Sequence, residues 1–90
     1  MRGTEEHIGV IRDKPGIYAG LVQSQATGQQ LAICYRQDDK LIVKICLVKE
    51  VTGDHNGAKV VLHMPEHPTD ELRVELEQIE SIYPIRDYQH

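Results

Sequence analysis

The longest apolar segments of the chain lie in its middle, at 31–35 and 41–48, and Asp38 and Asp39 separate them. Two apolar runs joined by a pair of turn-forming residues are typical of a β-hairpin. If the two aspartates form the turn, the strands on either side pair in antiparallel fashion. We therefore expect a hairpin over 31–48 to be the strongest structural element of this chain.

Both faces of this predicted hairpin are apolar. One face gathers Ala32, Cys34, Leu41, Val43, Ile45 and Leu47. The other gathers Leu31, Ile33, Tyr35, Ile42, Cys46 and Val48, with Lys44 as its charged member. A sheet with one face in water would alternate apolar and polar residues. We therefore expect a barrel interior to cover one face, and a loop, a helix or another chain to cover the other.

The same register separates the two cysteines. Cys34 lies opposite Val43, and Cys46 lies opposite Leu31, so the two sulfur atoms point to opposite faces of the sheet. They are then too far apart for a disulfide bond. Both are expected to be reduced, small core residues, as in a cytoplasmic protein.

The N-terminal third predicts a shorter hairpin. Apolar residues at 8–11 and 17–22 flank Asp-Lys-Pro-Gly at 13–16, and Pro followed by Gly suits a type II turn. The stretch 23–30 is polar, rich in glutamine and interrupted by Gly28, so we expect a loop there.

Beyond the central hairpin, turn-forming residues at 52–57 precede a further strand over 58–64. Two prolines and several polar residues then interrupt the chain at 65–70.

The last third of the chain fits two structures. Residues 72–77 alternate apolar and charged side chains, as a strand does, and a helical turn at 78–80 would lead into a final strand over 81–86. A helix over about 70–83 would also give an apolar stripe, but it leaves Val74 and Ile82 outside that stripe. We favour the strand.

Together these elements predict a mainly β fold over a single domain, 1–90, with frayed ends at 1–6 and 87–90. We expect a small five- to six-stranded antiparallel barrel or roll. Its order of strands resembles SH3-like and Sm-like barrels in architecture, without a diagnostic motif. The alternative is an α+β fold with an antiparallel sheet packed by a C-terminal helix at about 70–83.

Composition narrows the possible partners. The chain has 90 residues, no Trp or Phe, and a formal net charge of −4, and seven of its acidic residues lie in 61–90. Nucleic-acid binders usually carry the opposite balance. No apolar run approaches the ~20 residues that span a bilayer, so we expect no membrane contact.

One short pattern resembles a catalytic motif. The five residues at 63–67 read His-Met-Pro-Glu-His, which matches the His-x-x-Glu-His zinc site of inverted zinc proteases. That site needs both imidazoles on one helical turn, and Pro65 makes a regular helix there unfavourable. We therefore reject the protease reading, expect no cofactor, and do not expect an enzyme.

Three other functions remain as alternatives. Metal or small-ligand binding would require the loops that carry His55, His63 and His67 to meet at one end of a barrel. RNA binding would require a basic stripe across the central hairpin, formed by Arg36, Lys40, Lys44, Lys49 and Lys59. An acidic mimic of nucleic acid is a third alternative, with Glu75, Glu77 and Glu80 against a partner's basic groove.

The surplus apolar surface of the central hairpin leads to our main hypothesis. Large exposed apolar patches mark interaction surfaces. We expect a non-catalytic interaction or adaptor module that self-associates, as a homodimer or higher oligomer, or docks on a protein partner. The predicted interface residues are Ile33, Tyr35, Ile42, Lys44, Cys46 and Val48.

Overall fold

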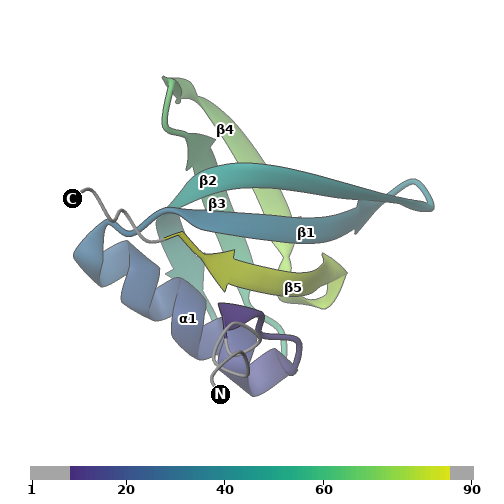
Figure 1. The fold of residues 1–90 in the computed structure, drawn as a ribbon. Coiled ribbons are helices and arrows are strands. Elements are labelled where there is room, and N and C mark those ends of the chain that lie inside the picture. Colours follow the sequence, from purple (N-terminus) through teal and green to yellow (C-terminus); the bar gives the residue numbers. More distant parts are fainter. Residues whose placement is uncertain (1–8, 86–90) are drawn as a thin grey trace, which may run out of the picture.

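The protein is built around a five-stranded antiparallel sheet with the strand order β4-β3-β2-β1-β5 (Figure 1). The computed structural model describes residues 9–85. In chain order, the elements are α1 (Lys14–Thr27), β1 (Leu31–Gln37), β2 (Lys40–Thr52), β3 (Lys59–Met64), β4 (His67–Glu75), the 3-10 helix η2 (Leu76–Gln78) and β5 (Ile79–Pro84). The predicted mainly β fold is confirmed. The frayed ends predicted at 1–6 and 87–90 lie outside the described residues.

The central hairpin has the predicted turn and register. Cys34 lies opposite Val43, and the pairing continues without a shift along the whole of β1. Asp38 and Asp39 have φ values of 53° and 67°, which are left-handed backbone conformations. A two-residue type I′ turn requires such values at both positions, and aspartate tolerates them better than most residues do.

The predicted N-terminal hairpin is wrong, because its turn residues begin helix α1 instead. The Asp13 carboxylate accepts a hydrogen bond of 2.8 Å from the Gly16 amide and so caps the helix. Pro15 occupies the first turn, where a missing N–H costs nothing. The helix continues through most of the loop predicted at 23–30 and ends at Gly28, which has a φ of 79°.

Helix α1 covers one face of the sheet. Its buried side chains Ile17, Leu21 and Ser24 recur every three or four positions and form one stripe. The helix lies close to β5 at Gly20, where an added Cβ would be 2.6 Å from the Cδ1 of Ile82. The core beneath the helix consists of Ile17, Leu21, Leu31, Ile33, Tyr35, Cys46, Val48, Ala58, Val60, Leu62, Val74, Leu76, Ile79 and Ile82.

Strand β2 belongs to both halves of the sheet. Its first half, 40–46, pairs with β1, and its second half, 47–52, pairs with β3. The register between β2 and β3 shifts at a bulge between Val48 and Glu50. Bulges bend a strand and increase its twist. Because β3 pairs only with the second half of β2, the β1–β2 hairpin extends beyond the rest of the sheet (Figure 1).

The C-terminal third forms strands, as we favoured, and the alternative helix at about 70–83 is wrong. Val74 and Leu76 are buried because they point inward from β4 and the turn that follows it. The helical turn predicted at 78–80 lies two positions earlier, as η2. The predicted interruption at 65–70 is shorter than expected, since β4 begins at His67.

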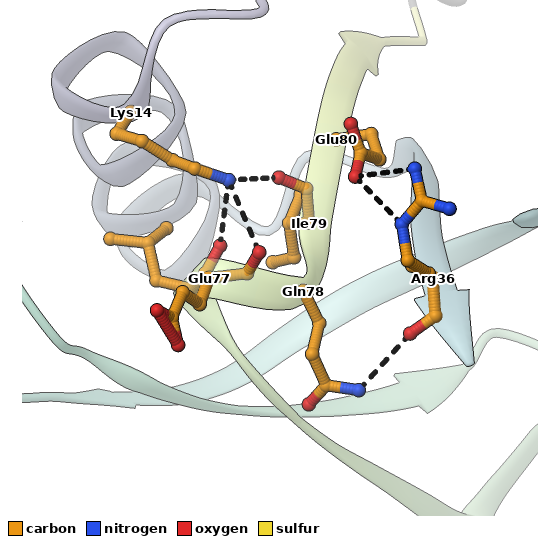
Figure 2. Close-up of polar contacts among 7 residues, drawn as sticks. Lys14, Arg36, Glu77, Gln78, Ile79 and Glu80 are labelled. Carbon is orange, nitrogen blue, oxygen red and sulfur yellow. Dashed lines mark hydrogen bonds and ion pairs between the residues drawn. The ribbon is translucent and has the colours of Figure 1, made fainter. Parts of the chain in front are cut away.

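One lysine joins the N-terminal helix to the C-terminal strands. The Lys14 ammonium donates hydrogen bonds to the backbone oxygens of Ile79 at 2.6 Å, Leu76 at 3.3 Å and Glu77 at 3.4 Å (Figure 2). An ammonium group near the last carbonyls of a short helix satisfies acceptors that have no partner in the helix. Lys14 therefore fixes the start of α1 against η2 and the first residue of β5.

Candidate interaction surface

Most of the predicted interface residues lie in the core. Four of the six are at most 7% exposed: Ile33, Tyr35, Cys46 and Val48. Ile42 is partly buried, and Lys44 is exposed. These side chains belong to the protein's own core, to which helix α1, the turn η2 and the inward side chains of the other strands all contribute. The four buried side chains cannot reach a partner from this fold, so the interface hypothesis has to be applied to the opposite face of the hairpin.

The opposite face is the exposed one. Leu41, Val43 and Ile45 of β2 are 57%, 65% and 48% exposed, and Tyr83 of β5 is 44% exposed. Ala32 of β1 lies between them, because it pairs with Ile45 on one side and with Tyr83 on the other. We call these five residues the outer face. They form an apolar surface that crosses three neighbouring strands.

An open pocket adjoins the outer face at the turn between β3 and β4. Its volume is about 680 Å³, and it is lined by Gln30, Val43, Ile45, Met64, Pro65, Glu66 and His67. Most of the lining is apolar. Two outer-face residues therefore form one wall, and the β3–β4 turn forms the opposite wall.

The sizes of the side chains in β1 indicate which face of the central hairpin is buried. Leu31, Ile33 and Tyr35 alternate with the smaller Ala32 and Cys34, and only the larger set is fully buried. Large aliphatic and aromatic side chains gain most from burial. The size difference along β1 thus identifies the core face, which the count of apolar residues alone did not.

The cysteines are both free, and they differ in exposure. Cys46 is fully buried, whereas Cys34 is partly buried beside Val43. Burial raises the pKa of the Cys46 thiol to about 11, against a smaller lowering effect of the nearby Lys44 charge. A thiol with such a pKa is protonated at neutral pH and is a poor nucleophile.

The three histidines that the alternative metal site would require do not lie together. His55 lies in the turn after β2, where its ring meets the edge of Tyr18 at a centroid distance of 6.4 Å. His63 and His67 lie at the other end of β3. Across residues 9–85, no group of three His, Cys, Asp or Glu side chains is placed to hold a metal ion.

Ion pairs interrupt the predicted basic stripe. Arg36 pairs with Glu80 at 3.2 Å, as Figure 2 shows, and Lys49 pairs with Glu71. The hydrogen bond from Lys49 lowers the pKa of Glu71 below its ordinary value. In the part of the chain that the structure describes, the members of the stripe without an ion pair are Lys40, Lys44 and Lys59.

The chain matches no protein-family model, and the comparisons with curated proteins and with solved structures found no similar protein. Among the described residues, the structure contains no helix with the length and hydrophobicity needed to cross a membrane. The outer face and its pocket are therefore interpreted from their own geometry.

Proposed function

We propose that this protein is a non-catalytic interaction module that docks on a protein partner through its outer face. One observation carries this proposal. Leu41, Val43 and Ile45 expose between 48% and 65% of their surface on the same side of one strand. Isolated exposed apolar residues are ordinary, but a contiguous group of them is typical of an interaction surface.

The surroundings of the outer face support the same function. The exposed residues Asp38, Asp39 and Lys40 border it at the hairpin turn. An apolar centre with a polar border is the usual composition of a protein interface. We further infer that the bent sheet is a small barrel of the SH3-like or Sm-like kind, and that the two free cysteines belong to a protein of a reducing, cytoplasmic compartment.

RNA binding is the less favoured function. Two of the five basic side chains that it would use are engaged by Glu80 and Glu71. Of the described tyrosines, Tyr35 is buried, Tyr18 donates a hydrogen bond to the backbone oxygen of Gly53, and Tyr83 is exposed but belongs to the apolar outer face. The stacking and phosphate contacts that RNA recognition needs are therefore reduced.

Site-specific photo-crosslinking in the native cell tests the proposal. A photo-reactive benzoylphenylalanine replaces Val43 on the outer face in one variant. In the matched control it replaces Val22, an exposed valine on α1. Sedimentation velocity of the purified protein then separates self-association from docking on a different protein.

We expect a protein adduct from position 43 that is absent from position 22. Adding Ile45→Asp should remove it, while circular dichroism shows that the variant remains folded. Adducts of equal yield at both positions, or none at position 43, would contradict the proposed function.

A further inference from the structure

One edge of β2 has no neighbouring strand. Residues 40–46 pair with β1 on one side, whereas pairing with β3 begins only at Leu47. Among the residues that the structure describes, no strand therefore pairs with the other side of 40–46. An unpaired strand edge presents a row of N–H and C=O groups that can pair with another extended chain.

The turn determines which residues face this open edge. The residues that flank a two-residue turn, Gln37 and Lys40, form a hydrogen-bonded pair. Hydrogen-bonded positions recur at every second residue, so Ile42 and Lys44 also bond to β1. The backbone groups of Leu41, Val43 and Ile45 consequently point toward the open edge. The residues that expose apolar side chains are thus the same residues that offer free backbone groups.

The opposite side of the same strand segment carries two lysines, one on each side of the partly buried Ile42. Lys40 and Lys44 are both exposed, and neither takes part in an ion pair within residues 9–85. Two residues of opposite charge that lie directly across from each other on neighbouring strands stabilise the pairing by about 0.2–1 kcal/mol. A strand that fits this edge therefore has apolar residues opposite Leu41, Val43 and Ile45, and acidic residues opposite the two lysines.

We propose that the partner contributes an extended segment of alternating apolar and acidic residues, which adds to β2 as an antiparallel strand along 40–46. This inference rests on the proposed function and specifies its binding mode. Strand addition uses backbone hydrogen bonds for affinity and alternate side chains for specificity. The pocket beside Ile45 and Pro65 receives an apolar side chain at one end of the added strand.

A second copy of the chain fits the edge less well. Two β2 strands paired about Val43 would place Leu41 opposite Ile45, which is favourable. The same pairing would place each Lys44 opposite Ile42 and each Lys40 opposite Cys46 of the other copy, so neither lysine would face a carboxylate. An acidic strand would instead add opposite-charge pairs at both lysines, and such pairs stabilise strand pairing by about 0.2–1 kcal/mol. The charge pattern therefore favours an acidic partner strand.

A synthetic peptide of alternating valine and glutamate tests this binding mode by fluorescence anisotropy. In the proposed pairing the valine amides face β2 and the glutamate amides face solvent. One control peptide carries N-methyl groups on its valine amides, another carries them on its glutamate amides, and a third replaces glutamate by lysine. The protein variant Lys44→Glu completes the set.

We expect the first peptide to bind and the valine-methylated peptide to bind at least about tenfold more weakly, since it loses several backbone hydrogen bonds. Methylation of the glutamate amides should change the affinity by less than about twofold, because those amides stay in water. The lysine peptide should not bind the native protein, and Lys44→Glu should weaken binding of the first peptide.

Equal binding of the two methylated peptides, or no binding of the first peptide, overturns strand addition. Either result leaves the proposed function intact if crosslinking at position 43 still captures a protein. If the protein self-associates through this edge, peptide binding should instead weaken as the protein concentration rises. That result would overturn the proposal that the partner contributes an acidic strand.

Discussion

The ammonium of Lys14 donates a hydrogen bond of 2.6 Å to the backbone oxygen of Ile79, across most of the length of the chain (Figure 2). Two further backbone oxygens, those of Leu76 and Glu77, lie within 3.4 Å of the same nitrogen. The start of the helix and the start of the last strand are therefore joined by one side chain. This contact joins the start of α1 to the turn η2 and the start of β5.

Replacing this lysine should destabilise the fold. Lys14→Met keeps most of the side-chain volume but leaves the three carbonyls without their donor, and hydrogen bonds to charged groups contribute roughly 1.5–3 kcal/mol. Because the contact is partly exposed, we expect a loss of about 1–2 kcal/mol in the free energy of unfolding. Urea denaturation measures this free energy. The control variant is Lys40→Met, at an exposed lysine without an ion pair in the described residues, and it should change the free energy of unfolding by less than about 0.5 kcal/mol.

Two glycines provide a matched pair of substitutions: Gly28 at the end of α1, and Gly57 between β2 and β3. Gly28 has a φ of 79°, whereas Gly57 does not have a positive φ, and an added Cβ would meet no atom within 4 Å at either position. Gly28→Ala should lower the free energy of unfolding by about 1 kcal/mol, because alanine is strained in the left-handed region. Gly57→Ala should leave it unchanged or raise it slightly. Equal effects in thermal denaturation would show that the helix does not end as described.

The two thiols should differ in their reactivity. Cys46 is fully buried and its pKa is raised to about 11, while Cys34 is only partly buried. Iodoacetamide at pH 8 should therefore alkylate Cys34 much faster than Cys46, since both access and thiolate are needed. Mass spectrometry of tryptic peptides measures the two rates. In urea the rates should become similar, and rapid labelling of Cys46 in the native protein would mean that α1 does not cover it.

The carboxyl of Glu71 should titrate below its ordinary pKa because Lys49 donates a hydrogen bond to it. The folded protein then binds fewer protons here than the unfolded chain does. The resulting stabilisation is complete above the ordinary pKa and is lost as the pH falls through the lower, folded value. Lys49→Met should raise the pKa of Glu71 in a carbon-13 NMR titration, whereas Lys40→Met should not. An unchanged pKa in Lys49→Met would contradict the ion pair.

The sequence predicts much of the sheet because local chemistry determines it. Asp38 and Asp39 lie between two apolar runs and suit a tight turn, and the turn then sets the whole register of β1 and β2. The alternation of apolar and charged residues over 72–77 favours a strand, although Leu72 and Leu76 also fit a helical stripe, and the structure forms β4 there. Patterns of this kind depend only on residues close together in the sequence, so they can be predicted from the sequence.

Helix α1 and the location of the exposed outer face depend on packing between residues that are far apart in the sequence. Asp13, Pro15 and Gly16 are suited to a turn and equally to a helix start, so local preference alone does not separate the two. Once α1 is missed, the count of apolar residues does not indicate which face of the hairpin is buried, and the larger side chains of β1 are the remaining signal. For this reason the predicted interface residues include Ile33 and Cys46, which the helix-covered core buries.

Amide hydrogen exchange along β2, followed by NMR at a concentration where the protein is monomeric, tests the open edge most directly. The amides of Leu41, Val43 and Ile45 should exchange rapidly in the free protein, whereas those of Ile42 and Lys44 should be protected by β1. Addition of the valine–glutamate peptide should slow exchange at the first three positions. Uniform protection from Leu41 to Ile45 in the free monomer would show that the edge is already paired, and would contradict both the exposed surface and the strand addition built on it.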